Sequence, residues 1–165
     1  MPEKRTIERA RRDKRQGKSA STQAGEFVRE EIHHIREGKH GARSTEQAIA
    51  IGLSKARRAG VKLPAPKKGT ASKRTREAAQ DDIRAAKRSS RKRPSAKRSS
   101  AMRKRLKREG AKAASRKSLA KHARAVARKR TASQRSAAAR KASRTKGARG
   151  RSQAAKKAAR TRSRK

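Results

Sequence analysis

The side chains of this sequence that could do chemistry are its lysines and arginines. There are 55 of them against 12 aspartates and glutamates, which gives a formal net charge of +43. Residues 1–63 carry a net charge of +8 and residues 64–165 carry +35. No acidic side chain follows Glu109, whereas 21 basic ones do. Ammonium and guanidinium groups at this density attract phosphates, so the sequence predicts charge neutralisation of a polyanion.

Duplex DNA is the polyanion that the sequence favours. Modules that bind single strands or read RNA sequence stack bases on aromatic rings, and the only aromatic residue here is Phe27. The predicted contacts are therefore to phosphates, through Lys87, Arg88, Arg91, Lys92, Arg93, Lys97, Arg98, Arg103, Lys104, Arg105, Lys107, Arg108, Arg124, Arg128, Lys129, Arg130, Arg149, Arg151, Lys156, Lys157 and Arg160. The alternative is an RNA-binding or ribosome-associated basic protein, and a scaffold on another polyanion comes third. A solubilising extension would not need charge of one sign.

Two short runs of residues are partly similar to the sequence of a minor-groove hook. They are Arg149-Gly150-Arg151 and Arg91-Lys92-Arg93-Pro94. Neither has the full Arg-Gly-Arg-Pro string, and such tripeptides arise by chance in a chain this basic. We do not take either string as a motif.

The other chemistry-bearing residues predict neither an enzyme nor a metal site. The histidines are His33, His34, His40 and His122, and there is no cysteine. Neighbouring helical histidines diverge by about 100° and do not chelate easily, so a zinc site would need Glu30, Glu31 or Glu37. Exposed polar histidines are the favoured interpretation. No nucleophile or phosphate-loop motif is present. We expect no catalytic residue, no metal and no cofactor.

Two helices are predicted in the first half of the chain. Residues 24–37 place apolar side chains at intervals of four, four and three, and Gly38 is a natural stop. A second helix begins at Ser44, which can cap the backbone N–H of Gln47 while the Gln47 side chain reaches back. Gly60 fits the left-handed position after its last turn.

These helices predict a hairpin over residues 22–63 with a small core. Its apolar stripe exceeds what two short helices can hide from water, so we expect a marginal hairpin or a homodimer through residues 24–63.

The second half predicts disorder. From Thr70 on, the chain is largely Ala, Lys, Arg and Ser, with one local helix candidate at residues 74–88. The predicted fold class is mainly α, with a short helical hairpin head and a largely disordered basic tail, and we expect the tail to gain helix when it binds DNA. The predicted domains are a charged N-terminal arm (1–21), the hairpin (22–63), a Pro-containing linker (64–70) and the polybasic tail (71–165).

A resemblance supports the same function. Residues 37–60, which read Ser-x-x-Gln-Ala-Ile-Ala-Ile after a Gly-containing turn, resemble small bacterial proteins of unknown function. The tail is similar in composition to those of bacterial histone-like proteins related to the linker-histone C-terminus, although it is richer in Arg. Together these likenesses imply a cytoplasmic, nucleoid-associated protein. No run approaches the roughly 20 apolar residues of a membrane span, so no membrane partner is expected.

Overall fold

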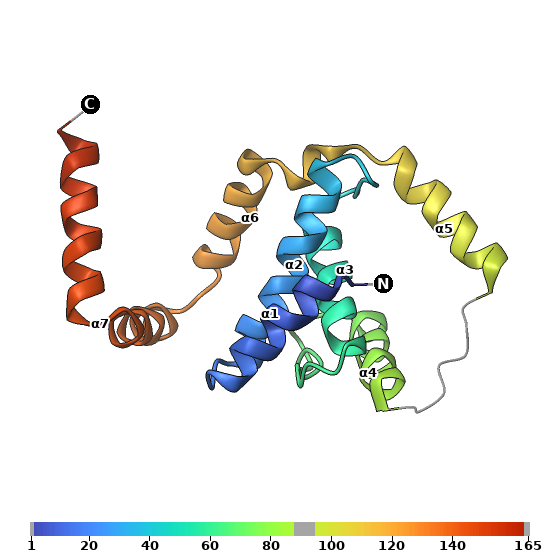
Figure 1. Ribbon diagram of the computed structural model, residues 1–165, viewed down its shortest axis with the longest axis horizontal. Coiled ribbons are helices and arrows are strands. Elements are labelled where there is room, and N and C mark those ends of the chain that lie inside the picture. Colours follow the sequence, from blue (N-terminus) through green and yellow to red (C-terminus); the bar gives the residue numbers. More distant parts are fainter. Residues whose placement is uncertain (1, 88–94, 164–165) are drawn as a thin grey trace. The chain divides into compact units, whose positions relative to one another are not determined.

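The computed structural model describes residues 2–87 and 95–163, with the side chains of residues 145 and 146 excepted. These residues are mostly helical (Figure 1). Residues 1–122 make one compact unit and residues 123–165 a second. The helices are α1 (Lys4–Arg15), α2 (Ala20–Arg36), α3 (Thr45–Arg58), α4 (Lys73–Lys87), α5 (Ala96–Arg108), the 3₁₀ turn η1 (Ala111–Ala114), α6 (Arg116–Arg128) and α7 (Ala132–Arg162).

The two helices predicted in the first half are present as α2 and α3, which pack against each other (Figure 1). As predicted, α3 begins after Ser44, whose Oγ accepts a hydrogen bond from the N–H of Gln47 at 3.2 Å. The Gln47 side chain reaches back one residue further than predicted, and its Oε1 accepts from the N–H of Arg43 at 2.9 Å. The cap therefore satisfies the Gln47 N–H, one of the groups that the first helical turn leaves without partners, and the second bond ties the Gln47 side chain to the residue before the N-cap.

The end of α3 also follows the sequence pattern. Gly60 has a φ of 88°, a left-handed conformation that glycine adopts without a Cβ clash. The N–H of Val61 then donates to the carbonyl of Ala56 at 3.1 Å. This turn sends Val61 and Leu63 back onto the apolar face of the hairpin.

Helix α1 covers one half of that apolar face. Phe27, 1% exposed, lies in a cluster to which α1 contributes Ile7 and Ala10. The members are Ala10, Ala24, Phe27 and Ala56, with Ile7, Leu53, Val61 and Leu63 packed against them. The segment that the sequence indicated as a charged arm therefore provides part of the core.

The other half of the face is covered by residues from beyond position 105. Ala113 and Ala114 of η1 are buried with Ile32, Ile35, Ala42 and Ala48, and Leu119 packs against this cluster. Backbone groups tie the segment down as well. The N–H of Gly41 donates to the carbonyl of Leu106 at 2.8 Å, and Nε of Arg36 donates to the carbonyl of Ala114 at 2.9 Å.

We expect one buried hydrogen bond to make this docking measurable. Thr45 Oγ1 donates to the carbonyl of Ala113 at 2.7 Å in a buried setting. Thr45→Val keeps the shape but leaves that carbonyl without its donor, which should cost about 1–3 kcal/mol of unfolding free energy. Thr70→Val is the matched control, because Thr70 Oγ1 donates to the carbonyl of Lys67 at the same 2.7 Å but in an exposed turn. Urea unfolding followed by far-UV circular dichroism should show a change within about 0.5 kcal/mol for the control. Equal losses would contradict the docking.

The prediction of a largely disordered tail from residue 71 is wrong. Most of the described tail is helical, in α4, α5, α6 and α7. Composition indicated repulsion between like charges, but alanine and arginine are also among the strongest helix formers. In addition, residues 106–119 gain burial against α2 and α3, which no local pattern in the tail reveals. The prediction that the tail gains helix when it binds DNA assumed that the free tail is disordered, so the premise of that prediction is not met.

The first helix of the tail packs on the hairpin. Helix α4 spans nearly the range predicted for it and contacts α3, where Nε of Arg58 donates to Asp82 at 2.6 Å. Asp82 is buried and Ile83 half-buried.

Homodimerisation through residues 24–63 stays a prediction, but its premise of an uncovered apolar stripe is not met, since α1, η1 and Leu119 cover that stripe. No helix among the described residues is long and apolar enough to cross a membrane.

Candidate nucleic-acid interface

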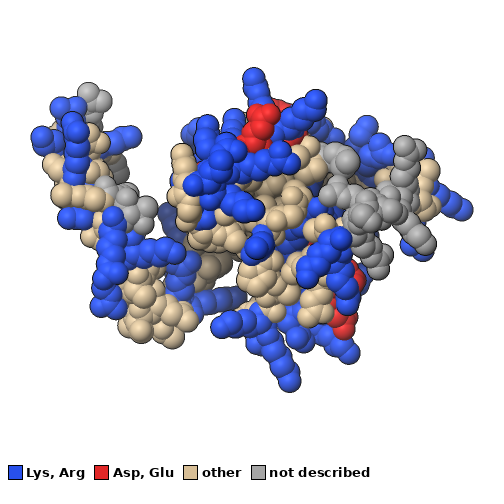
Figure 2. Space-filling view, turned by 60° about the horizontal axis from the view of Figure 1, so that its bottom comes forward, with Lys and Arg blue, Asp and Glu red and all other residues tan. Residues whose placement is uncertain are grey.

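The predicted phosphate-binding residues lie on the surface wherever the structure describes them. Arg88, Arg91, Lys92 and Arg93 fall outside the described residues. Every other predicted position is exposed: Lys87 at the end of α4; Lys97, Arg98, Arg103, Lys104, Arg105, Lys107 and Arg108 on α5; Arg124 and Arg128 on α6; Lys129 and Arg130 after it; and Arg149, Arg151, Lys156, Lys157 and Arg160 on α7. Figure 2 shows Lys and Arg over most of the visible surface, with Asp and Glu only in small groups.

Basic residues in and between the first three helices are in part neutralised within the protein. Lys18 pairs with Asp13 at 2.7 Å, and Lys39 pairs with Glu37 at 2.9 Å. Arg9 lies 3.7 Å from Glu26. In contrast, no Lys or Arg of α5 or α6 forms an ion pair with a carboxylate of the described residues. The charge of these two helices is therefore left for an external anion.

Helix α5 presents basic side chains around most of its circumference. Seven of its thirteen residues are Lys or Arg. At 100° per residue they occupy an arc of about 220°, and the remaining line carries Ser99, Met102 and Leu106. Met102 is 54% exposed. Any approach to α5 from the basic side therefore meets ammonium or guanidinium groups first.

Helix α6 places four of its five basic residues in a single stripe. Lys117, Lys121, Arg124 and Arg128 recur at intervals of four, three and four, which puts them within about 60° of one another. We call these four residues the α6 stripe. The opposite face carries Leu119, which packs on the core. Two members of the stripe, Lys117 and Lys121, were missed in the sequence analysis. The same interval search that found the apolar faces of α2 and α3 would have found them.

Helix α6 is held near its middle by an acid on α3. Nδ1 of His122 lies 2.9 Å from Glu46, so His122 is a partner rather than a free polar side chain. The pKa of Glu46 is lowered by hydrogen bonding to its own backbone amide and, next, to His122. This contact joins residues 76 positions apart and fixes the side of α6 that faces the core.

Helix α7 is two helical segments joined at a kink. Gly147 has a φ of 62° and a ψ of 176°, which no helix contains. The first segment begins at Thr131, whose side chain and that of Gln134 form a reciprocal cap. Beyond the kink, Arg149, Lys156 and Arg160 recur at intervals of seven and four and share one face.

The first of the two runs that are partly similar to a minor-groove hook, residues 149–151, is helical in the structure. Arg149 to Arg151 follow the kink as the start of the second segment of α7. One guanidinium nitrogen of Arg151 donates to the carbonyl of Ser143 at 2.9 Å, across the kink. A hook needs extended backbone in the groove, so this string does not have the conformation of one. The second string, residues 91–94, lies outside the described residues.

Comparison with known proteins finds a similarity in the first part of the chain. Residues 3–68 match the model of a family of unknown function (DUF6496). This range contains α1, α2 and α3 as well as residues 37–60, whose pattern resembles small bacterial proteins. No match to this chain was found among curated proteins or among solved structures.

Proposed function

We propose that this protein binds duplex DNA with little sequence preference and, as a histone-like, nucleoid-associated protein, neutralises phosphate charge so that DNA can be compacted or bridged. The observation that carries the proposal is the unpaired charge of α5 and α6. Their Lys and Arg side chains are exposed and have no carboxylate partner among the described residues. A polyanion is the partner that such helices favour.

The density of charge on the α6 stripe suits a duplex. From Lys117 to Arg128 the helix rises about 16 Å, at 1.5 Å per residue. A duplex of that length carries about ten phosphates, since one charge falls every 1.7 Å of its axis. The stripe can thus neutralise a sizeable share of the phosphates that it faces without contact to a base.

Base reading by stacking is disfavoured by the position of the one aromatic residue. Phe27 is 1% exposed and belongs to the core, so it is not available as a platform for bases. Proteins that bind single strands depend on such platforms for about 1–3 kcal/mol per base. This supports duplex binding over single-strand binding. Because phosphates carry no base identity, it also supports tolerance of sequence.

The test removes the α6 stripe in the full chain. Replacing Lys117, Lys121, Arg124 and Arg128 together by glutamine retains helix propensity and removes four charges. At about 0.9 per phosphate contact, the slope of log affinity against log salt should become shallower by about 3 to 4, and affinity at 0.1 M salt should fall by up to about 10³-fold. The measurement is fluorescence anisotropy with a labelled duplex at several salt concentrations.

A matched variant controls for the change in net charge. Four of the five exposed arginines of helix α1, Arg5, Arg11, Arg12 and Arg15, can be replaced by glutamine in the same way. This variant should keep most of the wild-type affinity and salt slope. Equal losses in the two variants would show that net charge, not the α6 stripe, governs binding. If structured RNA outcompetes duplex DNA for the wild-type chain at every salt concentration, the RNA-binding alternative replaces the proposal.

A further inference from the structure

Two histidines that the sequence indicated as exposed lie around a buried carboxylate. His34 and His40 have side chains only 13% and 20% exposed, whereas His33 is 64% exposed. Between the first two lies Glu31, whose side chain is fully buried. Glu31 and His34 are one turn apart on α2, and His40 is in the turn before α3. The prediction of exposed histidines holds for His33 and is wrong for His34 and His40.

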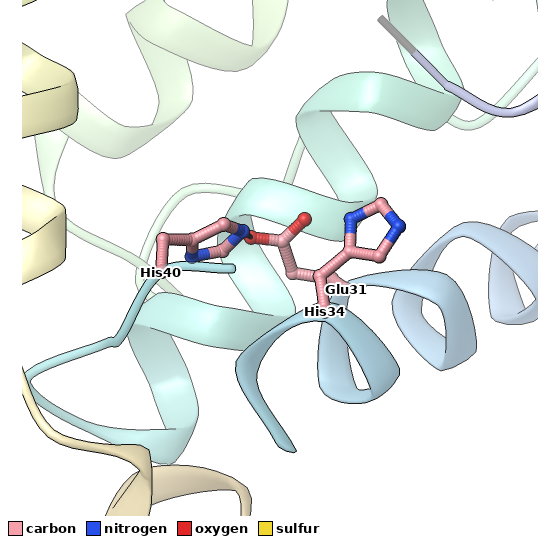
Figure 3. Close-up of side chains that lie close together, drawn as sticks. All are labelled: Glu31, His34 and His40. Atoms are coloured by element: carbon pink, nitrogen blue, oxygen red, sulfur yellow. Dashed lines mark ion pairs between the residues drawn. The ribbon is translucent and has the colours of Figure 1, made fainter. Parts of the chain in front are cut away.

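The three side chains converge on one point. One ligand atom from each lies within 4.8 Å of the others. Nε2 of His40 is 3.3 Å from a Glu31 oxygen, about the separation of two ligands on a tetrahedral ion bound at 2.0–2.1 Å. Figure 3 shows the His34 ring with one nitrogen toward the Glu31 carboxylate and the other turned away.

Each histidine is held by a second partner through its other nitrogen. Nε2 of His34 is 2.8 Å from Oε1 of Glu3, and Nδ1 of His40 is 3.2 Å from the carbonyl of Gly41. Both partners are acceptors, so each of these nitrogens carries the hydrogen. The remaining nitrogens, Nδ1 of His34 and Nε2 of His40, are then lone-pair donors in the neutral rings.

The surroundings of Glu31 need more positive charge than the protein provides. Glu30 and Glu31 are buried in succession on α2, and both face Lys55. Nζ of Lys55 is 2.6 Å from one oxygen of Glu31 and 3.6 Å from Glu30, so one ammonium serves two buried carboxylates. A buried carboxylate without a matching charge is costly. The other Glu31 oxygen meets the His40 nitrogen, where a cation would separate two groups that both offer lone pairs.

We propose that Glu31, His34 and His40 bind a divalent transition-metal ion, with Zn²⁺ as the fitting occupant. Two imidazoles and one carboxylate suit Zn²⁺, and they do not provide the all-oxygen shell that Ca²⁺ or Mg²⁺ prefers. Glu31 binds through the oxygen that faces His40 and keeps the other oxygen on Lys55. The partial exposure of both histidines leaves room for water as the fourth ligand. The ion joins α2 to the turn before α3 and supplies the missing charge.

The test is zinc titration of the full, chelator-treated chain by isothermal calorimetry. We expect one Zn²⁺ per wild-type chain. His34→Ala and His40→Ala should each bind at least about tenfold more weakly, since even loss of an outer partner costs 10- to 100-fold. Glu3→Gln should weaken zinc binding by a factor within the same 10- to 100-fold range, because Glu3 is an outer partner of His34. The matched control is His33→Ala, because His33 neighbours His34 on α2 but lies outside the cluster.

Cobalt provides a second readout that does not depend on one variant. Tetrahedral Co²⁺ absorbs visible light strongly, and the chain has no cysteine that could generate such a spectrum. The bands should appear with the wild-type chain and with His33→Ala, and be lost with His40→Ala. If His34→Ala fails to fold, His40→Ala decides, because His40 lies outside the helices. Absence of zinc binding by the wild-type chain, or equal losses for His33→Ala and His40→Ala, would overturn the proposal.

Discussion

Raising the salt concentration from 50 to 200 mM should weaken binding of duplex DNA to the full chain by about 10³–10⁵-fold, the range for 6–10 phosphate contacts. Helix α5 alone has seven exposed Lys and Arg residues, and the α6 stripe adds four. Each contact releases condensed counterions, and salt opposes that release. Anisotropy titrations with one labelled duplex across this range would measure the slope.

The control for this expectation changes the DNA and keeps the protein. Two duplexes of equal length and unrelated sequence should bind with affinities within about threefold at every salt concentration, because phosphate contacts carry no base identity. A slope of log affinity against log salt that corresponds to only one or two phosphate contacts would show that the basic helices do not bind the DNA backbone. A strong preference for one duplex would indicate base readout and would contradict a sequence-tolerant protein.

A second large effect is expected at the closest approach of α2 and α3. A Cβ on Gly52 would lie 2.7 Å from the Cα of Val28 and 3.0 Å from its backbone nitrogen, so the helices would have to move apart. Gly52→Ala should therefore destabilise the protein through overpacking, which typically costs about 1–3 kcal/mol. In a unit of modest core, a loss of this size is a large part of the total stability.

The same substitution elsewhere on the hairpin provides the control. Gly25 is an exposed residue of α2, and a Cβ there would meet nothing within 4 Å. Gly25→Ala should stabilise by about 0.5–1 kcal/mol, because alanine is the better helix former. Urea unfolding should thus give opposite signs for the two variants. A Gly52→Ala protein as stable as Gly25→Ala would show that the helices do not pack this closely.

The sequence showed where α3 begins and ends because those signals are local, whereas α2 begins at Ala20, four residues before its predicted start. The cap at Ser44 and the left-handed Gly60 act on backbone groups within one turn, so residue type and spacing are sufficient. Gly52 lies inside α3, where a glycine costs about 1 kcal/mol relative to alanine, but its role was not predicted from the sequence. Its partner, Val28, was visible only in the structure.

The tail shows why composition alone misled. A high density of like charge predicts disorder when the chain has little apolar surface to bury. Here the few apolar side chains are used across long separations: Ala113 and Leu119 meet Ile32 and Ile35. No periodicity within the tail reveals that contact, because the other half of the cluster is more than sixty residues away along the chain. The helix propensity of alanine and arginine then acts on a segment that is already anchored.

By itself, the sequence determined the charge of this protein and the helical nature of its first half. Charge is a sum over residues and needs no coordinates, so the expectation of a polyanionic partner does not depend on the fold. Only the tertiary structure decided which charges remain unpaired on α5 and α6, and which groups gather around Glu31. The reason is distance along the chain. Glu3, His40 and Lys55 surround α2 from three separate elements, and residues so far apart in sequence meet only when the helices pack.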